Sequence, residues 1–184
     1  MRKLFSSRGF TLLELVVVVL IIAVLASVAV PQYKMAVARV RYLTLQRTVR
    51  KVMQAEQAYF HATGNFTADL DLLDIKFPPW KSERKFLDEE DGHNLALHIG
   101  FDGTELLIRN YPDYLEIMMR DEKLPVGFEM FDWHYPDMAT NPDVMKAHLI
   151  ESYCVGSMNN LEATRRTCKA FGAKVDIGDG MWKF

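Results

Sequence analysis

The sequence lacks the short motifs by which common hydrolases and nucleotide-binding enzymes are identified. It contains no G-x-S-x-G, no G-x-x-x-x-G-K-[ST] and no H-E-x-x-H. Its five histidines are scattered, and none stands at zinc-ligand spacing from a cysteine. We therefore expect a protein that is not an enzyme and that uses no cofactor and no metal.

Cysteine is scarce, because Cys154 and Cys168 near the C-terminus are the only two. An even count in a chain with a membrane-targeting segment permits a disulfide formed in an oxidising compartment. Closing a loop of about 15 residues is worth roughly 3 kcal/mol in the chain-entropy estimate. Two buried free thiols are the alternative.

Charge, glycine and proline are almost absent from one segment. Residues 10–30 contain no Gly, no Pro and a single charged residue, Glu14. A run of this length and composition is long enough to cross a bilayer as a helix. Pro31 follows the run, and we expect it to kink the helix or to end it.

Beyond Pro31, apolar residues recur at helical spacing, interrupted only at Glu56. Gly64-Asn65 predicts the end of the helix. If Pro31 only kinks it, one helix of about 75 Å extends from near Thr11 to near Thr63, and its first half must lie in lipid or against other subunits. The apolar positions that we expect in the domain core or in subunit contacts are Met35, Ala38, Tyr42, Leu45, Val49 and Val52.

Residues 64–184 contain short strand-like runs separated by turn residues. A hairpin is predicted around residues 101–104, and helices are predicted from Asn141 and over 161–171, the second ended by Gly172. The fold class predicted is α+β, a long N-terminal helix packed on a small antiparallel sheet. The four strand-like runs are 95–99, 105–108, 114–119 and 128–133.

Charge is segregated along the chain. The segment from Lys34 to Lys51 is basic, whereas residues 52–184 carry 13 basic and 23 acidic residues. We interpret the basic segment as meeting anionic lipid head groups or acidic residues of neighbouring subunits, and DNA binding is the alternative. Acid runs at 88–92 and 176–180 are interpreted as solvated loops, with calcium binding as the alternative, although neither has EF-hand spacing.

Arg8-Gly9-Phe10-Thr11-Leu12-Leu13-Glu14, followed by Leu15-Val16-Val17-Val18-Val19-Leu20, resembles the prepilin cleavage and methylation signal. Type IV pilins and type II secretion pseudopilins share this signal, in which a short basic leader ends in Gly and the fifth residue after the cut is Glu. Pro31 and Tyr33 stand where many pilins have Pro and Tyr. Residues 58–66 resemble the end of the pilin spine helix, so the resemblance covers about residues 2–75.

The resemblance implies that a prepilin peptidase cleaves between Gly9 and Phe10 and methylates the new amine of Phe10. In the pilin family that amine is thought to pair with the glutamate of an adjacent subunit, which here is Glu14. A carboxylate in a transmembrane helix costs a few kcal/mol and usually has a partner. The implied segments are a cleaved leader over 1–9, a transmembrane and filament-core helix over 10–30, an amphipathic continuation over 31–63, and a C-terminal pilin domain over 64–184.

The implied partners are membrane lipid before assembly, the prepilin peptidase, an inner-membrane assembly platform, and identical copies in a helical filament. The precursor would cross the inner membrane once, with its C-terminal domain in the periplasm. It would then move to a pilus outside the cell or to a periplasmic pseudopilus.

Three functions remain open: a pilus subunit, a type II secretion pseudopilin, and an exported enzyme or binding domain tethered by the helix. The cysteine pair favours the pilus subunit modestly, because many pilins carry a disulfide in this region. An ordinary signal peptide cut after Ser27-Val28-Ala29 is a further alternative for the N-terminus. Glu14 inside the apolar run and the helical pattern beyond Pro31 argue against it.

Overall fold

The structure, a computed structural model, describes residues 10–88, 93–111, 114–133, 149–156, 161–178 and 180–184. The chain divides into two compact units, Met1–Ala38 and Arg39–Phe184. Helix α1, Leu12–Thr63, begins in the first unit and ends in the second. The predicted helix at 141 and the leader, including Gly9, lie outside the described residues.

Helix α1 confirms the prediction of one long helix. Pro31 lies inside it and the helix continues beyond, so of the two outcomes expected for Pro31 an end of the helix is excluded. The helix ends where Gly64 adopts a φ of 79°, a backbone conformation that glycine tolerates, with its N–H donating to the Phe60 carbonyl (2.8 Å). Within the first unit, the large apolar side chains from Phe10 to Val30 are exposed.

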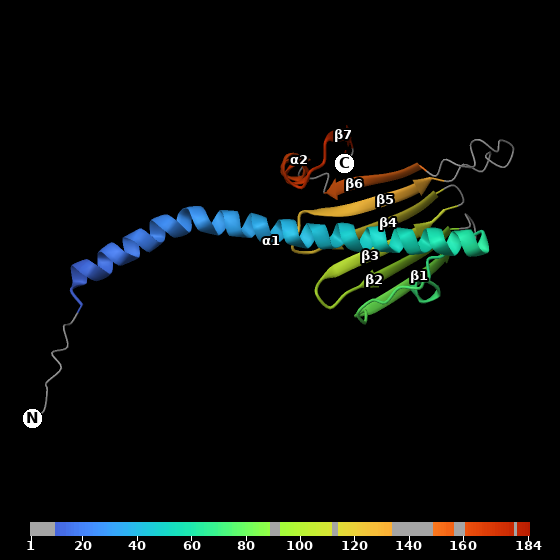
Figure 1. Cartoon of the computed structure of the whole chain (residues 1–184), viewed down its shortest axis with the longest axis horizontal. Coiled ribbons are helices and arrows are strands. Elements are labelled where there is room, and N and C mark those ends of the chain that lie inside the picture. Colours follow the sequence, from blue (N-terminus) through green and yellow to red (C-terminus); the bar gives the residue numbers. More distant parts are fainter. Residues whose placement is uncertain (1–9, 89–92, 112–113, 134–148, 157–160, 179) are drawn as a thin grey trace, which may run out of the picture. The chain divides into compact units, whose positions relative to one another are not determined.

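The described strands of the second unit form an eight-stranded antiparallel sheet with the order β1-β2-β3-β4-β5-β6-β8-β7 (Figure 1). The predicted α+β class is therefore confirmed. The strands are β1 Ser82–Asp88, β2 His93–Ile99, β3 Thr104–Asn110, β4 Tyr114–Asp121, β5 Val126–Trp133, β6 Leu149–Gly156, β7 Val175–Gly178 and β8 Met181–Lys183.

Four of these strands, β2 to β5, correspond to the runs predicted from sequence. The predicted hairpin joins β2 to β3, where Ile99 pairs with Glu105 and Gly103 adopts a φ of 85° in the turn. Strands β1, β6, β7 and β8 were not predicted from the sequence. Strand β1 is rich in charged residues, and β7 and β8 are only four and three residues long, so their apolar pattern is weak.

The core of the second unit lies between α1, from Arg39 onward, and one face of the sheet (Figure 1). Alternate residues of each strand face the helix, because side chains point to opposite faces of a sheet. Tyr42 contacts Phe128 of β5 with ring centroids 6.1 Å apart. The fully buried residues of this core include Tyr42, Leu45, Val49, Val52, Leu106, Ile108, Leu115, Ile117 and Phe128, each contributing about 1.5–3 kcal/mol of burial.

The helix positions expected in the core divide at the boundary between the units. Tyr42, Leu45, Val49 and Val52 are buried as predicted, whereas Met35 in the first unit is 51% exposed. Contact of Met35 with another subunit stays a prediction.

The described residues of the second unit also form two shorter helical elements. The 3₁₀ turn η1, Leu70–Leu72, lies in the link after α1, with the Asp69 side chain accepting a hydrogen bond from the Asp71 N–H. Helix α2, Leu161–Ala170, is followed by Gly172 with a φ of 106°, as predicted. Helix α2 packs against β5 and β6.

Candidate processing and assembly site

The start of α1 is closed by reciprocal hydrogen bonds between Thr11 and Glu14. The Thr11 N–H and the Thr11 hydroxyl both donate to the Glu14 Oε2 atom, at 2.9 and 2.8 Å, and the Glu14 N–H donates to the Thr11 Oγ1 atom at 3.2 Å. This is a capping box, which satisfies N–H groups that have no partner within the helix.

Thr11 was not predicted as a partner of Glu14, although Thr-x-x-Glu before an apolar run is the sequence signature of a capping box. The two donors are neutral, so they orient the carboxylate without cancelling its charge. Among the described residues, no basic side chain forms an ion pair with Glu14.

Phe10 lies immediately before the capped helix, and its side chain is 82% exposed. Residues 10 and 11, which follow the predicted cut, are not helical. Within the described part of the chain, α1 is the one helix that is long and apolar enough to cross a membrane.

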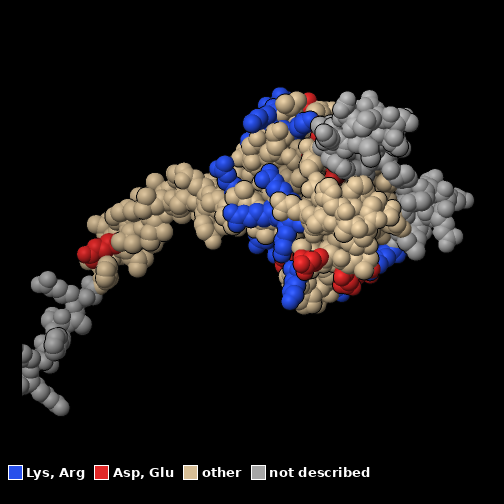
Figure 2. Space-filling view, turned by 45° about the vertical axis from the view of Figure 1, so that its right-hand side comes forward, with Lys and Arg blue, Asp and Glu red and all other residues tan. Residues whose placement is uncertain are grey.

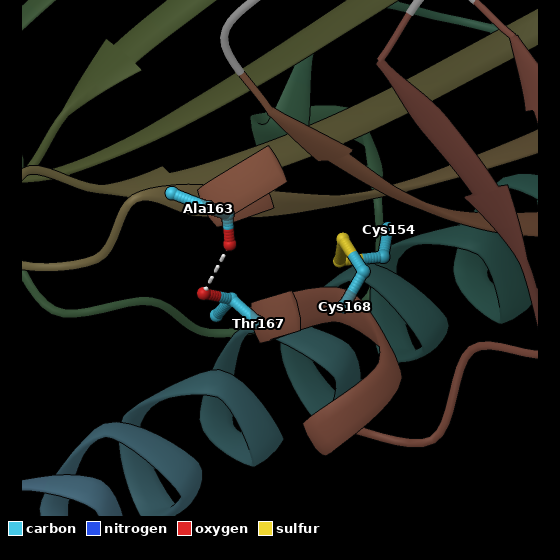
Figure 3. The surroundings of a disulfide bond; sticks show 4 residues. All are labelled: Cys154, Ala163, Thr167 and Cys168. Atoms are coloured by element: carbon cyan, nitrogen blue, oxygen red, sulfur yellow. Dashed lines mark hydrogen bonds between the residues drawn. A yellow bond between two sulfur atoms is a disulfide. The ribbon is translucent and has the colours of Figure 1, made fainter. Parts of the chain in front are cut away.

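A disulfide links helix α2 to the sheet (Figure 3). Cys154 of β6 and Cys168 of α2 are joined with their Cα atoms 5.7 Å apart, and both are fully buried. One turn of α2 is further braced by the Thr167 hydroxyl, which donates to the Ala163 carbonyl (2.8 Å; Figure 3). The alternative of two free thiols does not describe this structure, which has no free cysteine.

Glu56, the interruption in the apolar pattern, is fully buried against the sheet side of α1. Its Oε2 atom accepts a hydrogen bond from the Thr67 N–H (3.1 Å), which ties the link after α1 back to the helix. Burial raises the pKa of Glu56 to about 8, and the hydrogen bond from Thr67 opposes that rise. This role of Glu56 was not predicted, because the sequence does not show which group a lone carboxyl inside an apolar stripe contacts.

The opposite face of the sheet holds a second buried acidic group. Arg109 donates to both carboxylate oxygens of Glu116, at 2.7 and 2.9 Å. Burial, together with a hydrogen bond to Glu116, raises the pKa of Glu129 to about 8. These groups are cross-strand neighbours within the sheet, and we interpret them as structural.

The described residues contain no cluster of three His, Cys, Asp or Glu side chains that could bind a metal ion. The acid run at 88–92 falls almost entirely outside the described residues. Residues 176–178 of the other acid run lie in the exposed strand β7. Calcium binding has no support from the described part.

Comparison with known proteins yields one match. The sequence model of the prokaryotic N-terminal methylation motif matches residues 4–30. This motif is the prepilin-type signal of type IV pilins and pseudopilins, so the resemblance seen in the sequence is confirmed. No curated protein and no solved structure matches the chain. The motif and the long apolar helix together fit a membrane-anchored precursor of the pilin or pseudopilin type.

Proposed function

From the prepilin-type signal followed by an exposed apolar helix, we propose that this chain is a pilin-like structural subunit. A prepilin peptidase cleaves it after Gly9 and methylates the amine of Phe10, and the mature chain polymerises into a pilus filament. The observation that carries the proposal is the methylation motif over residues 4–30. Residues 10–30 form the membrane span and later the filament core, and 31–63 continue that helix into the domain that ends at 184.

The geometry at the start of α1 suits cleavage after Gly9. Proteolysis needs a chain segment outside regular structure, and the helix begins only at Leu12. Gly9 presents no side chain to obstruct a peptidase. The basic residues Arg2, Lys3 and Arg8 hold the leader on the cytoplasmic side of the membrane.

Glu14 provides the driving force for assembly. An ionised carboxylate in the membrane-spanning segment costs a few kcal/mol, and the neutral donors of Thr11 leave its charge uncompensated. The methylated amine of Phe10 on a neighbouring copy supplies the opposite charge. Pairing of these two groups draws the subunit from lipid into the filament and fixes the axial register between copies.

A type II secretion pseudopilin is the second candidate, because the same motif precedes both classes of subunit. The disulfide between Cys154 and Cys168 favours the pilus subunit. Deletion of the gene separates the two candidates. Loss of surface filaments supports a pilus subunit, and loss of exported proteins from the medium supports a pseudopilin.

The proposal is tested with two substitutions at Glu14. Glu14→Val removes both the charge and the hydrogen-bond acceptor, whereas Glu14→Gln keeps an acceptor for Thr11 and removes only the charge. We expect both variants to be inserted and cleaved, and both to yield at least about tenfold fewer sedimentable filaments than the native chain, since about 1.4 kcal/mol corresponds to that factor. The measurements are filament yield after shearing and the mass of the membrane-bound chain.

The Glu14→Gln variant is the matched control. If it assembled as well as the native chain, hydrogen bonding at Glu14 would suffice and the charge-pairing mechanism would be wrong. If the native chain itself were never cleaved in cells that build filaments, the proposed function would fail as a whole.

A further inference from the structure

Five basic side chains gather at the end of the domain that contains its first residue. Figure 2 shows Lys and Arg concentrated around this end of the domain. All five are exposed, and none of them forms an ion pair with an acidic side chain of the described residues. These five residues, here named the cationic collar, are Arg39, Lys81, Lys123, Arg165 and Lys169.

Three members of the collar are placed by contacts near Arg39, where α1 enters the second unit. Arg41, two residues after Arg39, pairs with Asp121 at the end of β4 (3.1 Å). In the turn after β4, the Lys123 Nζ atom donates to the carbonyl of Asp102 in the β2–β3 turn (3.3 Å). The Lys81 N–H donates to the carbonyl of the last residue of β2 (2.7 Å). Arg39, Lys123 and Lys81 therefore border the same end of the sheet.

The packing of α2 brings the other two members to this end. A Cβ atom built on Gly156, the last residue of β6, would lie 2.1 Å from the Thr164 Cγ2 atom, so α2 lies directly against the end of β6. Gly156 pairs with Val126, the first residue of β5 after the turn that contains Lys123. Arg165 and Lys169 stand on the exposed side of α2 at this position.

The same end also presents apolar side chains. Phe101 in the β2–β3 turn is 74% exposed, and Leu161 at the start of α2 is 50% exposed. The exposed acids at this end that form no ion pair are Asp102, which lies near Lys123, Glu105, Glu122 and Asp176, which lines a hollow with Arg165. They are four against the five collar residues. Residues 52–184 as a whole carry ten more acids than bases. The domain is therefore acidic overall, whereas basic side chains predominate at this end. A cationic rim with exposed aromatic and aliphatic groups suits the surface of an anionic bilayer.

The collar is also close to the membrane along the chain. Arg39 follows Val30, the last residue of the apolar run, by nine residues, or about 14 Å of helix. The head-group region extends roughly 5–8 Å beyond the hydrocarbon core on each side. Measured along the helix, Arg39 therefore follows the membrane span by about twice the thickness of one head-group layer.

We propose that the cationic collar binds the head groups of anionic phospholipids and rests the domain on the membrane before assembly. The inference deepens the proposed function, since it requires the apolar helix to be inserted as a membrane anchor. Lipid contact keeps the unassembled subunit close to the bilayer. Entry into a filament breaks this contact when the collar leaves the membrane surface.

The test uses the full chain in nanodiscs of phosphatidylcholine alone or with half phosphatidylglycerol. A fluorophore is attached at Glu122→Cys, next to Lys123 of the collar, or, as the matched control, at Asn65→Cys beyond the far end of α1. The native cysteines are already paired. A nitroxide on the lipid head group quenches the fluorophore on contact. We expect quenching at 122 to be at least about threefold stronger in the anionic discs, and to weaken in 0.5 M salt, since such contacts are screened.

Charge reversal supplies the second comparison. Lys123→Glu with Arg165→Glu should abolish the extra quenching, whereas Lys76→Glu with Arg84→Glu, an equal charge change outside the collar, should preserve it. Quenching at 122 that is independent of lipid charge, or that survives the first double substitution, overturns the proposal. A signal that instead rises with protein density would assign the collar to another copy and also overturn it. Failure of the chain to insert would sink the proposed function itself.

Discussion

At the scale of single residues, the two informative carboxyl groups of α1 have opposite surroundings. Glu14 is held by the neutral donors of Thr11 at the start of the helix, whereas Glu56 is fully buried over the sheet with one hydrogen bond from the Thr67 N–H. Sequence alone singled out Glu14, because a charge inside an apolar run is conspicuous. In the sequence, Glu56 was visible only as a break in the apolar pattern of the helix, because its partner is the backbone N–H of a residue eleven positions away.

Burial of Glu56 makes the stability of the domain depend on pH. The pKa of this carboxyl is raised from its usual 4.5 to about 8, so between these values the folded chain holds a proton that the unfolded chain has released. Stability therefore falls as pH rises through this window. We expect Glu56→Gln, which keeps the acceptor for Thr67, to be at least about 1 kcal/mol more stable than the native chain at pH 8. The gain should shrink toward pH 5.

Denaturant unfolding in detergent, followed by near-UV circular dichroism at pH 5 and pH 8, measures this difference. Glu105→Gln is the matched control, because Glu105 is exposed and its substitution should change the unfolding free energy by less than about 0.5 kcal/mol. A Glu56→Gln variant that is clearly less stable than the native chain at pH 8 would show that Glu56 functions as an ionised, paired group.

At the scale of elements, the spacing of apolar residues predicted the two α-helices. Helix α1 was predicted with both ends nearly correct, because its apolar run, its amphipathic half and Gly64 are strong local signals. Helix α2 was predicted for the same reason. Strands β1, β6, β7 and β8 were not, because their positions depend on pairing with strands far away in the chain, which local patterns do not record.

Removing the disulfide tests whether this bond holds α2 against the sheet. Replacing Cys154 and Cys168 together by Ala opens a loop of about 15 residues, which should cost roughly 3 kcal/mol of unfolding free energy. Hydrogen exchange should increase most in α2, because its remaining contacts are to β5 and β6. Phe171, directly after α2, stacks on the Tyr42 ring at 4.4 Å. Exchange in β2 and β3 serves as the internal control. Unchanged stability together with unchanged protection of α2 would contradict the structural role given to this bond.

At the scale of the whole molecule, the two units differ in which apolar side chains they bury. The first unit presents an apolar helical surface that no part of a single chain of this size could bury along its length, and the second unit encloses its own core between α1 and the sheet. The segregation of charge along the chain, basic before residue 52 and acidic after it, was visible in the sequence. The gathering of α2 and two turns into the cationic collar was not, since it arises only from the folded topology.

The central claim is that the chain is a prepilin-type precursor processed at one peptide bond. Intact mass spectrometry of the protein purified from filaments or from the inner membrane tests it most directly. We predict a chain that begins at Phe10, carries one added methyl group on its amine and retains the bond between Cys154 and Cys168. A chain that begins at Val30, or one that still carries residues 1–9, would contradict the account.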